Sequence, residues 1–158
     1  MKSGMLHAYL HGVGVEIMAN SDNVLRGGLT SKHIDVPELM HVVQFDALLD
    51  PIAPAENVVL SSHGIVPAEG IETVEYLTPV PEFRLSRSHL APCRESHLGI
   101  EGPFIVLVTE GTVTLTSREC PEGLSVSAGH AAWVGAWEDR PTIATGENSA
   151  TVFIARVP

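Results

Sequence analysis

The chain has 158 residues, 44% of them hydrophobic, and a formal net charge of −10. This length and apolar content fit one globular domain, or one domain with a piece of another. The negative charge argues against nucleic-acid binding and against attachment to an anionic membrane, because both need clustered lysine and arginine. No apolar run reaches transmembrane length and no signal peptide is evident, so we expect a soluble, cytoplasmic protein.

The first 35 residues combine short β-prone runs with glycine pairs. Runs over 7–10 and 13–19 surround a bend that contains two glycines, and this pattern is typical of a hairpin. Turn-forming residues at 20–23 then precede Arg26, and Gly27 and Gly28 follow it. The sequence therefore predicts two strands and a loop that carries Arg26.

A helix is predicted next, over about residues 36 to 44. Asp35 is suited to cap its N-terminus, and Pro37 fits the first helical turn. The apolar positions at helical spacing are Leu39, Val42, Val43 and Phe45. Prolines recur between residues 50 and 81, which predicts a connector with one or two short strands.

From residue 83 onward the sequence alternates between β-prone runs and turn residues. The predicted strands are 83–90, 104–109, 112–117, 123–127, 131–134, 142–145 and 151–157. Glu110 and Gly111 are interpreted as a hairpin turn between two of these strands. Many short strands at this spacing predict a mainly β protein, with a sandwich or barrel of the jelly-roll kind.

His7 and Tyr9 lie two residues apart in a predicted strand and so share a face. They could line a pocket or a metal site, or they could be a half-buried histidine and an aromatic side chain that pack over a barrel mouth. Glu16 faces opposite to Val15 and Ile17, so it lies either on a solvated face or in a polar cavity.

Two cations follow in the same stretch. Arg26 stands before a glycine pair, which suggests that a ligand or another backbone approaches closely there. Its guanidinium suits phosphate or carboxylate recognition, and Lys32 could add a point charge. Either residue could equally be a solvated surface charge.

Taken together, these residues form a recognisable string. HAYL, a glycine-rich bend, VEIMANSDNVLRGGLT and a DVPEL helix resemble the C-terminal side of the zinc domain of type I phosphomannose isomerases. The match runs almost without gaps over residues 6–39. The remaining sequence is similar in pattern to that family's C-terminal cupin-type barrel.

The resemblance implies a role for each residue. His7 would be one of four protein ligands of a catalytic zinc, and Tyr9 would lie beside the substrate. Glu16 and Arg26 would line the sugar-phosphate pocket as catalytic residues.

Two further roles follow from the same resemblance. Lys32 would line the pocket as a substrate-binding residue, and Asp22 would take part in ring opening. The implied reaction interconverts mannose 6-phosphate and fructose 6-phosphate, which needs acid–base groups near a polarised carbonyl.

The sequence also departs from the family. The other zinc ligands, a Gln, a His and a Glu, come from an N-terminal half to which no segment here is similar. We therefore expect a C-terminal fragment that is inactive alone and whose partner is the missing half or a second copy. Its parts would be a partial zinc-cupin segment (1–35), a helix and connector (36–82) and a cupin-like jelly roll (83–158). The alternative is a non-catalytic cupin module that binds a partner chain or a sugar.

Metal sites of cupin barrels use a His-x-His pair, a later Glu and a further His. Here no His-x-His pair precedes Glu110, and Trp133 stands where the further His would be, so the barrel itself is not expected to hold a metal. The remaining histidines of the barrel region are interpreted as scattered surface groups: His63, His89, His97 and His130. Trp133 and Trp137 are expected to pack in the core or at the barrel mouth.

Overall fold

The computed structural model describes residues 4–18, 20, 24–46, 55–57, 64–78 and 80–157. Its contacts divide the chain into two compact units, Met1–Pro51 and Ile52–Pro158. The division predicted from the sequence, at residues 35 and 82, stays a prediction. Each unit is described by itself below.

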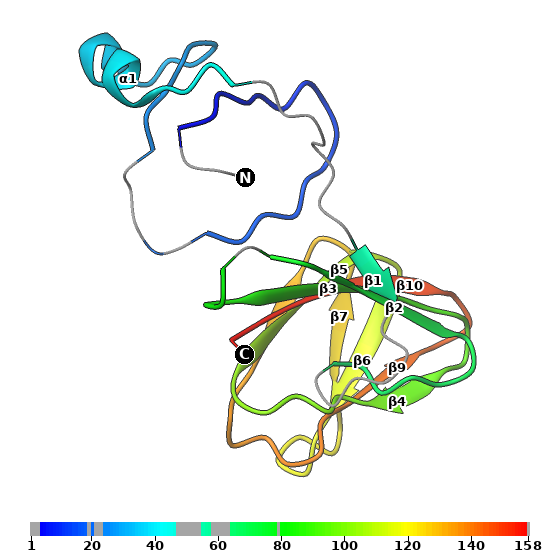
Figure 1. Ribbon diagram of the computed structural model, residues 1–158. Helices are drawn as coiled ribbons and strands as arrows, with labels where there is room; N and C mark the ends of the chain where they lie inside the picture. Colours follow the sequence, from blue (N-terminus) through cyan, green and yellow to red (C-terminus); the bar gives the residue numbers. More distant parts are fainter. Residues whose placement is uncertain are drawn as a thin grey trace. The chain divides into compact units, whose positions relative to one another are not determined.

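The first unit contains helix α1, Val36–Val42 (Figure 1). The Asp35 side chain accepts a hydrogen bond of 3.1 Å from the backbone N–H of Glu38, so the predicted cap is confirmed. The helix ends at Val42, two residues before the predicted end, because Val43 turns to extended backbone while its N–H still bonds to the carbonyl of Leu39. None of the helical residues is buried.

The two strands predicted over 7–10 and 13–19 are not present in residues 6–18, which contain no regular structure. The described part of this unit has a single isolated bridge, between Met5 and Gln44, where the Gln44 N–H donates to the carbonyl of Gly4 at 2.8 Å. A strand exists only where a neighbour receives its backbone hydrogen bonds, and among the described residues no segment pairs in this way with residues 6–18. The strand prediction is therefore wrong for this segment.

The second unit is built from strands (Figure 1). They are β1 (Ala55–Asn57), β2 (Ile71–Tyr76), β3 (Arg84–Leu90), β4 (Glu95–His97), β5 (Phe104–Glu110), β6 (Thr112–Thr116), β7 (Leu124–Ser127), β8 (Ala131–Val134), β9 (Thr142–Thr145) and β10 (Ala150–Arg156). All seven strands predicted after residue 83 are confirmed to within one residue at each end. The short strand β4 was not predicted.

These strands form two antiparallel sheets. The larger has the order β1-β2-β3-β10-β5-β8, and the smaller has the order β4-β9-β6-β7. Neighbours in each sheet are mostly distant in sequence, as β10 between β3 and β5 shows. Two sheets joined by such crossovers make the predicted jelly roll.

Glu110 and Gly111 do not form a hairpin, because β5 and β6 belong to different sheets. The chain turns a corner there with Gly111 at φ +73°, and a Cβ on this residue would collide with the backbone of Ser149. The turn that follows β7 contacts this corner, because the Ala128 N–H donates to the Gly111 carbonyl at 2.9 Å. The alternation on both sides was correct, but alternation does not tell a hairpin from a corner.

The core of the barrel follows from the period of two along each strand. In β5, for example, Phe104, Val106 and Val108 face inward and are buried. The same alternation buries Val152 and Ile154 of β10. A fully buried side chain of this size contributes about 1.5–3 kcal/mol, so this layer accounts for the cohesion of the unit.

At one end of the larger sheet, charged side chains occupy the inward-facing positions of the strands. Glu75 of β2 lies 3.6 Å from Arg84 Nε of β3 and 3.4 Å from Arg156 Nη2 of β10. Arg84 also donates to the carbonyls of Val80 and Phe83, so it fastens the turn between β2 and β3. One carboxylate thus links three neighbouring strands of the sheet.

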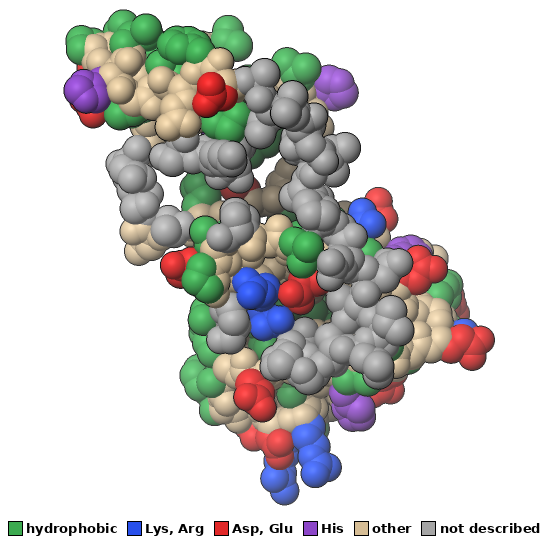
Figure 2. Space-filling view, in the orientation of Figure 1, with side chains coloured by type: hydrophobic (Ala, Val, Ile, Leu, Met, Phe, Trp, Pro, Cys, Tyr) green, Lys and Arg blue, Asp and Glu red, His purple; other side chains and the backbone are tan. Residues whose placement is uncertain are grey.

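On the face shown in Figure 2, basic side chains are few and acidic ones lie among them, with no broad basic patch among the coloured residues. No helix in the described residues is long and apolar enough to cross a membrane.

Candidate functional site

His7 and Tyr9 remain next to each other in the first unit although no strand holds them. Their rings meet edge to face with centroids 6.3 Å apart. The Nδ1 of His7 lies 3.3 Å from the backbone carbonyl of Met5, and Tyr9 is 72% exposed. A hydrogen bond to this carbonyl requires the tautomer with hydrogen on Nδ1, and in that tautomer Nε2 is the nitrogen available to a metal.

Glu16 is exposed, whereas Val15 and Ile17 on either side of it are half-buried. The alternation expected from the sequence therefore holds for these three residues even without a strand. Of the two readings that the sequence left open, the described surroundings place the carboxylate on a solvated face.

Arg26 is half-buried beside the glycine pair. A Cβ at Gly27 would lie 3.2 Å from a methyl carbon of Leu6, so the close approach predicted at this glycine is made by an apolar side chain of the same unit. At Gly28 (φ +143°) a Cβ would meet nothing within 4 Å. The glycine pair therefore packs against Leu6 on one side and faces open space on the other.

Lys32 is exposed, and its backbone N–H bonds to the Thr30 hydroxyl at 3.1 Å. Asp22 lies outside the described residues. Among the residues that are described, no ion pair or hydrogen bond joins Glu16, Arg26 or Lys32 to another candidate. Among the described candidates, the contact that the structure shows is the one between His7 and Tyr9.

A zinc ion needs three or four ligand atoms in one place. The described residues contain no group of three or more His, Cys, Asp or Glu side chains that could hold a metal ion. His7 offers one nitrogen with no second ligand beside it. The described residues of this chain therefore do not fit a zinc site by themselves. His89, His97 and His130 of the barrel are each exposed, and His63 lies outside the described residues.

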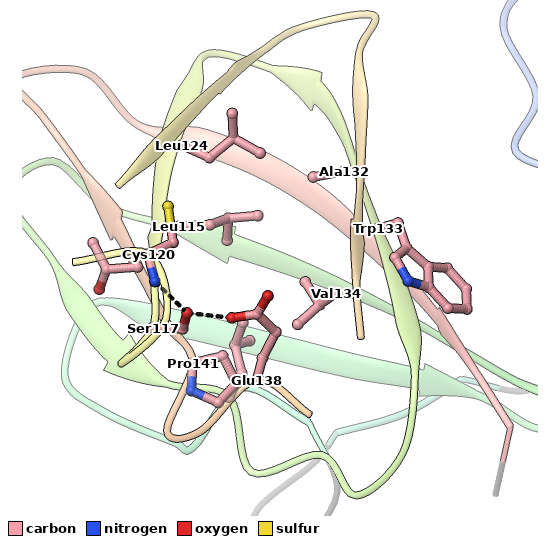
Figure 3. Close-up of a pocket in the computed structure, with 11 residues that line it drawn as sticks. Leu115, Ser117, Cys120, Leu124, Ala132, Trp133, Val134, Glu138 and Pro141 are labelled. Carbon is pink, nitrogen blue, oxygen red and sulfur yellow. Dashed lines mark hydrogen bonds between the residues drawn. The ribbon is translucent and has the colours of Figure 1, made fainter. Parts of the chain in front are cut away.

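A pocket of about 130 Å³ opens at one end of the barrel (Figure 3). Its wall is mostly apolar, and its residues come from several strands and from two loops. They are Leu98, Leu115, Thr116, Ser117, Cys120, Leu124, Ala132, Trp133, Val134, Glu138 and Pro141. In Figure 3 the indole of Trp133 points away from the other labelled side chains.

The polar corner of this pocket is formed by Ser117 and Glu138. The Ser117 hydroxyl donates to Oε2 of Glu138 and accepts from the backbone N–H of Cys120 at 3.0 Å. The sequence analysis did not single out either residue. Ser117 and Glu138 are 21 positions apart in two loops, and only the folded chain brings such positions together.

Neither tryptophan is in the core. Trp133 is 60% exposed because it alternates with the buried Ala132 and Val134 and so faces outward from β8. Trp137 lies over Gly135, where a Cβ would meet its ring. Of the two expected placements, the core is therefore wrong for both tryptophans. Trp133 lines the pocket at the end of the barrel, and Trp137 packs on the backbone of Gly135.

Comparison with known proteins places these features in context. No family model matches the chain. The chain is 36% identical over 140 residues to the mannose-6-phosphate isomerase of Salmonella typhimurium, a match that covers 89% of this chain and 32% of that enzyme. It is 34% identical over 147 residues to the Escherichia coli enzyme, covering 93% and 34% respectively. The bovine enzyme is 32% identical over 146 residues, covering 87% of this chain and 31% of its own length.

Among solved structures, the polyketide cyclase RemF of Streptomyces resistomycificus superimposes with a TM-score of 0.51 at 14% identity, covering 71% of this chain and 78% of that one. This likeness concerns the fold alone, and it confirms a mainly β protein with a cupin-type jelly roll. The chain spans about a third of the length of the curated relatives that it matches. It is thus similar, over nearly its whole length, to one part of mannose-6-phosphate isomerase, as the HAYL and NVLRGGLT motifs predicted.

Proposed function

We propose that this chain is the C-terminal part of a mannose-6-phosphate isomerase, the enzyme that interconverts mannose 6-phosphate and fructose 6-phosphate. The single observation that carries the proposal is the similarity to curated isomerases over about nine tenths of the chain. The sugar phosphate is the substrate, and the remaining part of the enzyme, supplied separately or by a second copy, is the partner.

In this proposal the first unit supplies active-site side chains. The reaction moves a proton between C1 and C2 of the sugar through an enediol, so negative charge develops on oxygen and acid–base groups are needed. Arg26 stabilises that charge, because a guanidinium remains protonated throughout. Glu16 is a candidate for the proton transfer and Asp22 for the opening of the sugar ring. Tyr9 and Lys32 bind the substrate, Lys32 through its charge.

Zinc is the cofactor in this proposal, and it would polarise the sugar oxygens when bound. His7 supplies one ligand, and residues outside this chain supply the others. The contact between His7 Nδ1 and the Met5 carbonyl supports this assignment, because the tautomer that donates to the carbonyl presents Nε2 to a metal.

The zinc assignment is tested by isothermal titration of the chain in metal-free buffer. One ligand cannot form a stable site, so we expect affinity weaker than about 1 µM and little change in His7→Ala. Tight one-to-one binding by the chain alone would contradict a site completed from elsewhere.

The activity is tested by a chimaera in which this chain replaces the matched third of the Escherichia coli isomerase. The conversion of mannose 6-phosphate is measured in the chimaera and in the chain alone. We expect activity in the chimaera and none in the isolated chain. A chimaera that melts like the parent enzyme but has no activity would favour the alternative, a non-catalytic cupin module.

Arg26→Ala in the chimaera separates two roles for this residue. Stabilisation of the transition state predicts a fall in kcat on the order of 10²-fold or more with a smaller change in KM. A phosphate anchor predicts a rise in KM at constant kcat. Lys32→Ala is the matched control, because a phosphate contact there predicts mainly a KM effect that grows at low salt. Unchanged kcat and KM in Arg26→Ala would show that Arg26 is not an active-site residue.

A further inference from the structure

The barrel pocket has the two features that a small-molecule site needs, an apolar wall and a polar group that can orient a ligand. Leu115 of β6 and Val134 of β8 form the inner wall, and both are buried. Leu124 of β7 forms the rim and is 51% exposed. The pocket is therefore open to solvent at Leu124 and closed by the core at its inner end.

Glu138 is the polar group. One of its carboxylate oxygens accepts the Ser117 hydroxyl, and Ser117 is itself held by the backbone N–H of Cys120. Figure 3 shows the second oxygen directed toward Leu115 and Val134, into the space that the labelled residues surround. In the described part of the chain, Ser117 is the one residue with a hydrogen bond to the Glu138 side chain. A half-buried carboxylate whose second oxygen faces an apolar pocket favours a donor or a cation as its partner.

The charge of the surrounding loops also favours a cationic ligand. The loops 117–123 and 135–141 carry four acidic side chains against two basic ones. Of the two arginines, Arg118 is already paired with Asp139 at 3.1 Å. Like charges at the rim repel anions and attract cations, so a sugar phosphate does not fit this pocket.

We propose that this pocket binds a small protonated amine with a branched-aliphatic or aromatic body. The ammonium group would donate to the free oxygen of Glu138, and the apolar body would lie against Leu115, Leu124 and Val134. An apolar cavity of about 150 Å³ holds a benzene ring. This pocket, at about 130 Å³, is slightly smaller but open at Leu124, so part of a ligand of that size would extend past the rim. The proposal concerns the barrel alone and does not depend on isomerase activity.

The two free cysteines provide a direct test. Cys120 lines the pocket and Cys93 does not, and both are exposed. Each thiol is labelled with N-ethylmaleimide at neutral pH, and its rate is followed by mass spectrometry of the peptides. Because both thiols are read in one sample, Cys93 corrects for any loss of reagent.

Benzylamine is the probe, with benzyl alcohol and benzoate as neutral and anionic analogues of the same shape. At a concentration about ten times a Kd near 1 mM, we expect benzylamine to slow the labelling of Cys120 at least about threefold and to leave Cys93 unchanged. Benzyl alcohol should protect less and benzoate not at all. Equal protection by all three, or by none, would overturn the proposal.

Glu138→Gln removes the charge and keeps an acceptor for Ser117. We expect it to weaken the affinity for benzylamine about tenfold, so that the protection of Cys120 falls to the level given by benzyl alcohol. Leu124→Lys is the second variant, because a cation at the exposed rim should repel the amine without disturbing the core. Protection that persists in both folded variants would overturn the proposal. If Glu138→Gln fails to fold, Leu124→Lys and the three probes decide it.

Discussion

The two units of this chain differ in what they bury. In Ile52–Pro158, sixteen hydrophobic side chains form one core cluster, with Val106, Val108 and Val152 fully inaccessible. In the described part of Met1–Pro51 no residue is buried, and Leu10 is 93% exposed. The residues proposed for the isomerase reaction all belong to Met1–Pro51.

The buried core that stabilises the chain therefore lies in the barrel, whereas the residues of the proposed active site lie in the first unit. The barrel buries enough apolar surface to form by itself, whereas the first unit exposes the side chains that a folded segment would bury. These exposed apolar side chains agree with the proposal that the chain is one part of a larger isomerase. Four experiments test the contrast, in order of expected effect.

Hydrogen exchange should show the largest difference. Amides of β5 and β10 are bonded on both sides within the larger sheet, so they should exchange only on global unfolding. Residues 6–18 belong to no ladder in the described part of the chain, so their amides should exchange almost at the rate of a free peptide. We expect protection to differ by on the order of 10³-fold or more. Equal protection in a proven monomer would show that the first unit is stable by itself.

A pair of truncations tests the same contrast by stability. Phe104→Ala removes a side chain that is 2% exposed, and it should lower the free energy of unfolding by about 3–5 kcal/mol. Leu10→Ala should change it by less than about 0.5 kcal/mol, because the leucine has almost no contacts to lose. Urea denaturation measures both. A large cost for Leu10→Ala would mean that the first unit packs on something in the isolated chain.

The corner between the two sheets gives a smaller effect. Gly111→Ala forces a side chain into a left-handed conformation and against the backbone of Ser149, so we expect a loss of about 2–4 kcal/mol. Gly129→Ala has a similar φ of +84° with nothing within 4 Å of the added Cβ. It should cost only about 1 kcal/mol. Thermal melts of the two variants should differ, and equal melting temperatures would remove the steric part of the explanation.

The charged end of the larger sheet should give the smallest of the four effects. Glu75→Gln leaves Arg84 and Arg156 without their shared carboxylate, and we expect a loss of about 1–2 kcal/mol because the group is only partly buried. Asp139→Asn breaks the more exposed pair with Arg118 and should cost less than about 0.5 kcal/mol. Urea denaturation at low and high salt distinguishes them, and an effect of Glu75→Gln no larger than that of Asp139→Asn would mean that the link between strands is not stabilising.

Much of the barrel could be predicted because its strands are encoded locally. The period of two and the turn residues placed seven strands almost to the residue, and Asp35 with Pro37 placed the helix start. The same reasoning failed over 7–10 and 13–19, where the β-prone runs are equally good. The difference lies outside those runs, since a strand also needs a neighbour to receive its hydrogen bonds.

The candidate site was predictable only as a set of residue types. The motif around Arg26 identified the related enzymes, and the curated isomerases support it. The Ser117–Glu138 corner and the link from Glu75 to two arginines had no local signature, because their members come from separate loops and strands.

The sequence by itself determined where the helix begins, the bounds of the seven strands after residue 83 to within one residue, and which family of enzymes the chain resembles. Only the tertiary structure decided that Gly111 turns between sheets, that Trp133 faces outward and that Glu138 meets Ser117. The physical reason is that periodicity and capping are set by neighbours along the chain. Sheet membership and pocket geometry are set by contacts between distant segments, which form only when the whole barrel has folded.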